Sequence, residues 1–471
     1  MQPAKLKRYW ILLPAAAPRR WRPCHVLREK AGLLRLTGEW AAAERLHREL
    51  AASAAASADR AALADARTDL ASMLLLMGAI DEAFDLAAEA RPLWDALGDD
   101  RGLARCITTL GSVHYQRSEY PKAMEYYREG LAIAQRGGDA MMSCRALGRI
   151  GLLHYDMGES QRSLEVLDEA LAAAERMGSH QLIASSSGNL GNVHLEQGRY
   201  EEAMACYQRA YRESLRIGDK QSTAFSEGNI AIIHEKQGRY AEAMEWTLRQ
   251  LQAFRELGDR VNLAVSLLNI GNIHSSRGEY GTALARYGEV IALARANRDK
   301  PILSYALYLS GTTLQELGRP EEVERFLAEA VAVAEEIGFN HYLCGYQSRL
   351  ARHYVERGDP VKAAALAAAA RELAEKVGRA EVLFELEVTG ALLAADGRAG
   401  QAARLTKLAG RAPEPEQEAG LQKRLFDLTG DQARRQAAAD AYRKLYGELP
   451  KHSYRKALEE LGALTPAPSP D

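Results

Sequence analysis

Histidines recur in this chain at a constant interval, and histidine both binds metals and transfers protons. They stand 40 residues apart, at His114, His154, His194, His234 and His274. A zinc ion needs its nitrogen ligands about 2.0–2.1 Å away. Equivalent positions on stacked helices are roughly 10 Å apart, so these side chains cannot share one ion. We interpret them as packing residues with hydrogen-bonded ring nitrogens, and expect no metal site and no cofactor.

Three other patterns look catalytic but lack a required neighbour. The segment His234–Gly238 has glycine where a zinc-protease motif needs its second histidine. The acidic pairs Glu201-Glu202 and Glu321-Glu322 fall at expected helix starts, where carboxylates favour the helix dipole. The glycines of Gly188–Gly191 fall inside an expected helix, not after a strand, so they form no phosphate loop. We therefore expect no catalytic residue and a protein that is not an enzyme.

Asparagines supply the better binding chemistry, because an amide side chain both donates and accepts hydrogen bonds. Asn189, Asn229 and Asn269 keep the 40-residue interval, and Asn192 and Asn272 follow one helical turn later. All five fall away from the apolar face of the expected helices. They either bind a ligand or bond to one another and stiffen the stack, and the residues leave both readings open. Other side chains expected on the same surface are Arg145, Arg149, Tyr305, Tyr308, Arg349 and Arg352.

Glycines mark the interval that positions all these side chains. Each repeating unit contains one marked position at which two helical segments meet, and five residues later most units carry a small side chain. The marked positions are Gly38, Gly78, Ser118, Gly158, Gly198, Gly238, Gly278, Gly318 and Gly358. A second small residue, such as Gly191 or Gly271, stands seven residues before the mark. The small columns predict close approach of two helices within one hairpin.

The residues between the marks predict helix–turn–helix hairpins. Ile230, Ile233 and His234 recur at helical spacing and form one face. The glycine ends the first helix because it tolerates a left-handed backbone, and proline at positions such as Pro320 begins the second. Gly-Asp pairs, such as Gly138-Asp139, end one hairpin and cap the next. Tyrosines at 127, 207 and 287 are expected to fill the space towards the next hairpin.

These columns resemble the tetratricopeptide-repeat family. The matching residues of one unit are Leu190-Gly191, His194 in the usual tyrosine place, Gly198-Arg199-Tyr200, Ala203, Tyr207 and Ala210. The usual repeat has about 34 residues. The 40-residue form is similar to that of spindle-orientation adaptors, kinesin light chains and bacterial signalling proteins. The resemblance covers residues 24–400. It implies an all-α, right-handed solenoid (superhelix) of stacked hairpins, whose concave groove binds peptides through asparagines.

The unit boundaries predict four segments. Residues 1–23 form a leader, expected to be disordered or the remnant of an upstream domain. Its short apolar stretch imitates a secretory signal peptide, but Pro14 interrupts it. Residues 24–410 form nine to ten repeats of 40 residues. Residues 411–464 form a helical C-terminal cap, and the proline-bearing tail 465–471 is expected to be disordered.

Composition excludes several classes of protein. The chain has 471 residues, a net charge of −2 and 47% hydrophobic residues, so it can bury a large core. Near-neutral charge argues against a nucleic-acid or membrane-surface partner. No apolar run approaches the roughly 20 residues of a membrane helix. Five scattered cysteines without a paired motif indicate reduced thiols and a cytoplasmic protein.

The sequence thus predicts a non-catalytic scaffold or adaptor that binds a peptide or helix of a partner protein in the concave groove. The alternative is a C-terminal sensory or regulatory array of a bacterial signalling protein, whose kinase, cyclase or ATPase domain is absent from this chain. An enzyme would need a convergent polar pocket, which the repeats alone are not expected to provide. The partner's identity and the oligomeric state are not indicated.

Overall fold

The computed structural model of the chain consists of helices joined by short turns. It describes residues 27, 30–32, 34, 40–57, 59–117, 119–297, 299–393 and 397–464. Within these residues there is no β-strand, and the predicted all-α solenoid of stacked hairpins is confirmed. The predicted leader, the tail 465–471, Gly38 and Ser118 lie outside the described residues.

Most helices have 17 or 18 residues and follow one another at the predicted interval. The first helices of the hairpins are α4 (Arg60–Leu76), α6 (Asp100–Gln116), α8 (Ala140–Asp156), α10 (His180–Glu196), α12 (Lys220–Lys236), α14 (Arg260–Ser276), α16 (Lys300–Glu316) and α18 (Asn340–Arg357). The second helices are α3 (Trp40–Ala56), α5 (Ile80–Leu97), α7 (Tyr120–Arg136), α9 (Ser160–Arg176), α11 (Tyr200–Arg216), α13 (Tyr240–Leu257), α15 (Tyr280–Asn297), α17 (Pro320–Glu336) and α19 (Pro360–Val377).

Shorter helices complete the chain. They are α20 (Ala380–Leu393), α21 (Gly397–Thr406), α22 (Pro415–Thr429), α23 (Gln432–Glu448) and α24 (His452–Glu460). Buried side chains of α20, α21 and α22, among them Phe384, Leu405 and Leu421, share one apolar cluster. Helix α22 is therefore anchored to the end of the repeats, whereas α23 and α24 share a small cluster around Ala438, Ala439 and Leu461.

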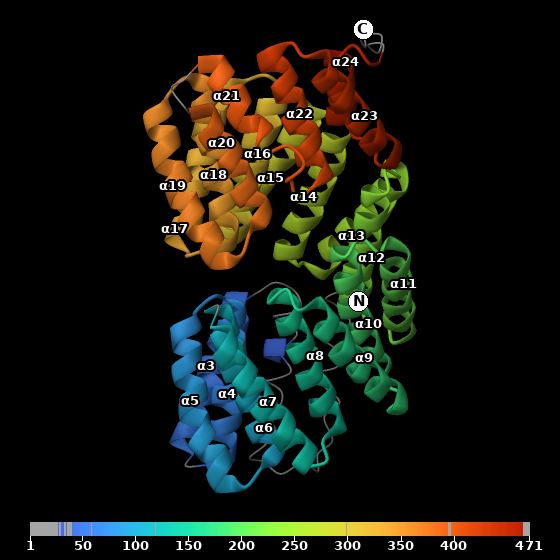
Figure 1. Cartoon of the computed structure of the whole chain (residues 1–471). Helices are drawn as coiled ribbons and strands as arrows, with labels where there is room; N and C mark the ends of the chain where they lie inside the picture. Colours follow the sequence, from blue (N-terminus) through green and yellow to red (C-terminus); the bar gives the residue numbers. More distant parts are fainter. Residues whose placement is uncertain are drawn as a thin grey trace. The chain divides into compact units, whose positions relative to one another are not determined.

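The chain divides into two compact units. The N-terminal unit comprises Met1–Ser226 with Glu256–Asp259, and the C-terminal unit comprises Glu227–Arg255 with Arg260–Asp471. In each unit, successive helices lie side by side along the chain (Figure 1). Each unit has its own main apolar cluster, one running from Ala64 to Met142 and the other from Leu251 to Ala363. The division of the chain at 24, 411 and 465 remains a prediction.

Turn chemistry explains why the helices end where they do. Gly158 and Gly198 have φ angles of 74° and 69°, which L side chains rarely adopt. Between hairpins, Asp139 accepts a hydrogen bond from the backbone N–H of Met142 at 2.9 Å, and Asp99 caps α6 in the same way. The predicted helix breaks and caps are thereby confirmed.

The two helices of a hairpin approach most closely at the second small column. A Cβ atom added to Gly191 would lie 2.5 Å from the ring of Tyr207, and one at Gly111 would lie 2.6 Å from Tyr127. Each tyrosine ring therefore packs against the glycine of its own hairpin. The sequence analysis did not predict this contact. Tyr127 also shares a buried cluster with Ile150 and Leu153 of α8, so it reaches the next hairpin as expected. One ring thus joins three helices.

Two glycines of α10 test this contact. Replacing Gly191 by alanine should destabilise the fold, because overpacking costs about 1–3 kcal/mol, more than the helix propensity that alanine gains. Gly188 has nothing within 4 Å, so Gly188→Ala should stabilise by about 0.5–1 kcal/mol. The free energy of unfolding, measured by urea denaturation with circular dichroism, checks both. Equal stability of the two variants would contradict the contact.

Candidate functional site

A cavity of about 800 Å³ lies within the C-terminal unit. One wall comes from the first helices of the last repeats, with Tyr308 on α16 and Arg349 and Arg352 on α18. Helices α20 and α22 supply further walls, and α23 and α24 close another side with Tyr442 and Tyr454. The volume falls in the range of pockets that bind small ligands or short segments of chain.

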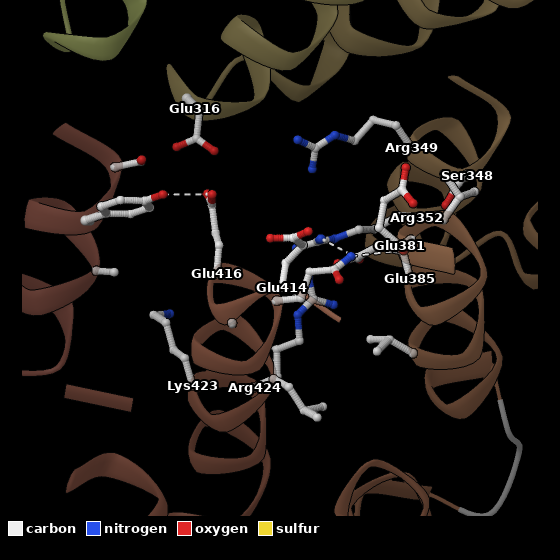
Figure 2. A pocket seen from close by; sticks show the side chains of 18 of the residues that line it. Glu316, Ser348, Arg349, Arg352, Glu381, Glu385, Glu414, Glu416, Lys423 and Arg424 are labelled. Carbon is white, nitrogen blue, oxygen red and sulfur yellow. Dashed lines mark hydrogen bonds and ion pairs between the residues drawn. The ribbon is translucent and has the colours of Figure 1, made fainter. Parts of the chain in front are cut away.

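Most charged side chains of the lining neutralise one another. Arg352 lies 3.4 Å from Glu356 and 3.5 Å from Glu385, and Lys423 lies 3.0 Å from Glu460. On another wall, the Tyr454 hydroxyl donates to Glu416 at 2.7 Å. Figure 2 shows the carboxylates and basic groups facing one another across the cavity.

Two arginines differ from this pattern. Within the described part of the chain, Arg349 and Arg424 form no ion pair, and both side chains reach into the cavity from different helices (Figure 2). Burial opposes the charge of Arg349, but the phenol of Tyr308 and the carboxylates of Glu385 and Glu316 outweigh it and raise its pKa. Burial and the charge of Arg349 lower the pKa of Arg352. The lining therefore holds two half-buried positive charges available to a ligand.

The predicted aromatic residues adjoin this cavity. Tyr308 stacks on Tyr346, with ring centroids 4.6 Å apart. Tyr305 meets Tyr342 edge-on at 6.3 Å, and Tyr342 is 41% exposed. Of the predicted binding residues, Tyr308, Arg349 and Arg352 are thus brought together in the cavity, with Tyr305 on the next turn of α16.

The other predicted basic residues lie in the N-terminal unit. Arg145 and Arg149 are exposed on α8, one turn apart. Asn189, on α10, lies near Gly148 of α8. A Cβ added to Gly148 would lie 3.9 Å from the Asn189 amide nitrogen. These side chains border one surface of α8 and α10, which is separate from the cavity residues of the C-terminal unit.

The five asparagines fall into two groups. The Tyr207 hydroxyl donates to the Asn192 side-chain oxygen at 2.8 Å, and Tyr287 donates to Asn272 at the same distance. The amide nitrogens of Asn192 and Asn272 remain as donors. Asn189, Asn229 and Asn269 are half-buried and make no side-chain hydrogen bond within the described residues. Asn192 and Asn272 therefore support their own hairpins, whereas ligand binding by Asn189, Asn229 and Asn269 remains a prediction.

The histidine column follows a simple rule. Where the residue five positions later is glutamate, the ring is paired: His114 Nδ1 lies 2.7 Å from Glu119, His154 lies 2.7 Å from Glu159 and His274 lies 2.5 Å from Glu279. Where that residue is arginine, at 199 and 239, the buried Nδ1 atoms of His194 and His234 have no hydrogen-bond partner in the part of the chain that the structure describes. Burial and then the neighbouring arginine lower the pKa of both rings. The predicted hydrogen bond is confirmed for three rings and wrong for two.

Sequence comparison identifies the repeats. Residues 64–136, 142–212 and 222–296 match the family described as tetratricopeptide repeat. The chain contains tetratricopeptide repeats in these three segments. Its 40-residue tetratricopeptide repeats place the columns of histidine, asparagine and glycine at equivalent points of successive hairpins, as the resemblance implied.

Solved structures share the fold of these tetratricopeptide repeats. A Rap protein complexed with competence and sporulation factor has a TM-score of 0.54 and 14% identity, with 84% of this chain and 99% of that chain covered. The apo form of the quorum sensor NprR from B. thuringiensis has a TM-score of 0.50 and 15% identity, with 75% and 99% covered. At such identities the similarity concerns the fold alone. No curated protein matches the sequence.

Some residues that line the cavity were not predicted as site residues. Arg424, Lys423, Glu416 and Gln417 come from helices that the sequence analysis treated only as an end cap. The repeats alone were not expected to provide a convergent polar pocket, and this cavity takes further walls from α20 and from α22 to α24. Among the described residues, no cluster of histidine, cysteine and acidic side chains could hold a metal ion. None of the described helices is long and apolar enough to span a membrane.

Asn192 and Asn189 should separate the two groups of asparagines. Asn192→Ala removes the acceptor of the buried Tyr207 hydroxyl and should lower the free energy of unfolding by about 1 kcal/mol. Asn189→Ala should change it by no more than about 0.5 kcal/mol. In a Tyr207→Phe background the effect of Asn192→Ala should shrink, which a double-mutant cycle measures. An equal loss in both backgrounds would contradict the pairing.

His194 should make stability depend on pH. Its folded pKa lies below 6.5, so the unfolded chain binds the proton more tightly, and stability is lost as the pH falls below about 6.5. Arg199→Glu should reproduce the pair of His154 with Glu159, raise the pKa of His194 and reverse the sign of this dependence. NMR titration of the ring checks the shift, with Arg199→Gln as the control that adds no carboxylate. An unchanged pKa in Arg199→Glu would refute this account.

Proposed function

We propose that the protein is a non-catalytic cytoplasmic scaffold that binds an acidic segment of a partner protein in the cavity of its C-terminal unit. The observation that carries the proposal is the pair of half-buried arginines, Arg349 and Arg424, which face the cavity without a carboxylate partner. A guanidinium group removed from water favours a planar carboxylate, which it can bind through two hydrogen bonds.

The remaining groups of the lining favour a peptide over a simple anion. Within the described residues, Glu316 and Glu414 are also without ion pairs, but both are exposed, so water solvates their charges. The buried Gln417 Oε1 atom has no hydrogen-bond donor. A backbone N–H group could supply that donor, and an acidic side chain could meet the arginines. A segment of polypeptide carries both groups.

The predicted asparagines extend this proposal along the repeats. We assign peptide-backbone binding to Asn189, Asn229 and Asn269, and to the free amide nitrogens of Asn192 and Asn272. Arg145, Arg149 and Tyr305 would meet side chains of the same or another segment. The similarity in fold to a Rap protein solved with competence and sporulation factor supports a binding role for the repeats.

Selection from a library of displayed random peptides tests the proposal. Peptides selected on the full chain should be enriched in aspartate and glutamate. Their affinity, measured by fluorescence anisotropy, should fall about tenfold or more in Arg349→Gln/Arg424→Gln, since one lost charge-assisted bond contributes about 1.5–3 kcal/mol. Arg128→Gln/Arg176→Gln is the matched control, in which two exposed arginines of the second helices α7 and α9 are replaced. Arg145→Gln/Arg149→Gln tests the other predicted basic pair in the same way.

The outcomes separate the sites. Equal affinity for the wild type and Arg349→Gln/Arg424→Gln would place the peptide elsewhere. A loss confined to Arg145→Gln/Arg149→Gln would move the site to α8, and an equal loss in the Arg128→Gln/Arg176→Gln control would mean that the binding is unspecific. A loss in Asn189→Ala, with stability kept, would support the asparagines as ligands of the backbone.

A sensory role is the second candidate. The similarity in fold to the quorum sensor NprR favours a sensory role, because the matched region covers 75% of this chain and 99% of that protein. In this case the repeats would regulate a signalling domain. The genomic sequence immediately upstream distinguishes the candidates: an in-frame kinase, cyclase or ATPase domain would favour the sensory array.

A further inference from the structure

The last helices of the chain contact the turns of three successive repeats. Pro450 lies against Gly238, in the turn after α12, and His452 lies against Gly278, in the turn after α14. His452 also meets the ring of Tyr280 edge-on, with centroids 5.7 Å apart. Lys456 Nζ donates to the backbone carbonyl of Glu316, at the end of α16, at 3.1 Å. The segment thus runs along one edge of the C-terminal unit.

These contacts fill space that other turns leave open. A Cβ atom added to Gly238 or Gly278 would come within 3.0 Å of Pro450 or His452, respectively. At Gly318 and Gly358, the equivalent glycines of the next two repeats, nothing lies within 4 Å. The glycines at 238 and 278 therefore serve two purposes: they turn the backbone, and they leave room for the C-terminal segment.

The segment is joined to the repeats by few apolar contacts. Helices α23 and α24 pack on each other and on Phe426 of α22, in a small cluster around Ala438, Ala439 and Leu461. Their direct contacts with the repeat turns come from exposed Pro450 and from half-buried His452 and Lys456. An element that few apolar contacts hold to its neighbours opens from them at a lower free energy than the core unfolds.

We propose that residues Gln432–Glu460, which we call the strap, release from the repeat turns without unfolding the repeats and so regulate entry to the cavity. The strap supplies one wall of the cavity, through Tyr442, Tyr454 and Lys456 among others. When it is released, Arg349 and Arg424 become open to an incoming segment. The inference rests on the proposed function only for the nature of the ligand.

Helix α22, which precedes the strap, stays fixed to the repeats. Its Leu421 and Leu425 belong to the apolar cluster of α20 and α21. Gln417 donates to the Glu381 carbonyl at 2.9 Å and to the Glu385 carboxylate at 3.2 Å. Gly430 ends α22 with a left-handed backbone, so the chain turns there into α23. Release of the strap therefore leaves Arg424 in place on α22.

Alanine at two equivalent turns tests the strap in the full-length chain. Gly278→Ala strains the turn and also collides with His452, whereas Gly318→Ala strains its turn alone, at φ angles of 80° and 75°. Hydrogen–deuterium exchange of amides in α23 and α24 should be about tenfold faster in Gly278→Ala than in Gly318→Ala. Exchange in α16, α18 and α22 should be the same in both variants.

Access to the cavity is measured in the same pair of variants. Ser348 is 7% exposed and lines the cavity, so Ser348→Cys places a thiol there. N-ethylmaleimide should label that thiol several-fold faster with Gly278→Ala than with Gly318→Ala, as followed by peptide mass spectrometry. The His452→Ala change, which removes the collision, should return the labelling rate of Gly278→Ala towards that of Gly318→Ala.

Three results would overturn the proposal that the strap releases and regulates entry to the cavity. They are equal exchange in the two variants, faster exchange that spreads through α14–α18, and faster exchange of α24 without faster labelling. The last would mean that the segment opens but does not guard the cavity. None of these measurements uses a partner, so a failure here leaves the peptide selection unaffected, and a failed selection leaves the strap unaffected.

Discussion

The packing of one large side chain on one glycine sets the geometry of each hairpin. Tyr207 on Gly191 and Tyr287 on Gly271 bring two helices so close that even a methyl group has no room. Leu167 on Gly151 does the same with a smaller residue. Because the large residue also packs towards the following hairpin, an error at this contact would displace the neighbour as well. The stacking of repeats, and with it every column of functional side chains, depends on this spacing.

The same contact explains a polar pair that recurs where the second helix carries tyrosine. The residue fifteen positions earlier then shares a hydrogen bond with the tyrosine hydroxyl, as in the pairs Ser112 with Tyr127 and Asn192 with Tyr207. Where the second helix carries leucine, the earlier residue is Leu152 for Leu167, and for Leu327 it is Thr312, which bonds to the backbone of its own helix. A buried hydroxyl needs a partner, and a buried leucine needs none. This correlation is visible in the sequence, but only once the register between the two helices is known.

The sequence predicted the features that depend on residues close together in the chain. Glycine turns, aspartate caps and the interval of 40 residues follow from backbone preferences, and the structure confirms them. The sequence analysis did not predict that the ring nitrogens of His194 and His234 lack a hydrogen-bond partner among the described residues. Arginine in place of glutamate at 199 and 239 could have indicated this. The cavity could not be predicted, because it depends on where residues 415–460 fold back. Repeats contact their neighbours and leave a regular pattern. A returning segment contacts distant positions, as Lys456 does at Glu316, 140 residues away, and Pro450 does at the still more distant Gly238, and it leaves no regular pattern.

That returning segment changes what the repeats can do. A row of hairpins by itself offers an open surface, on which a charged side chain stays in water and selects its partner weakly. Adding α22 and the strap converts part of the surface of the C-terminal unit into a cavity, where a guanidinium is half removed from water and its pairing matters more. Arg352 and Lys423 are neutralised within the chain, while Arg349 and Arg424 form no ion pair among the described residues. If the cavity binds the proposed acidic segment, its selectivity would arise from these two charges, and the proposed release of the strap would decide when the segment can reach them.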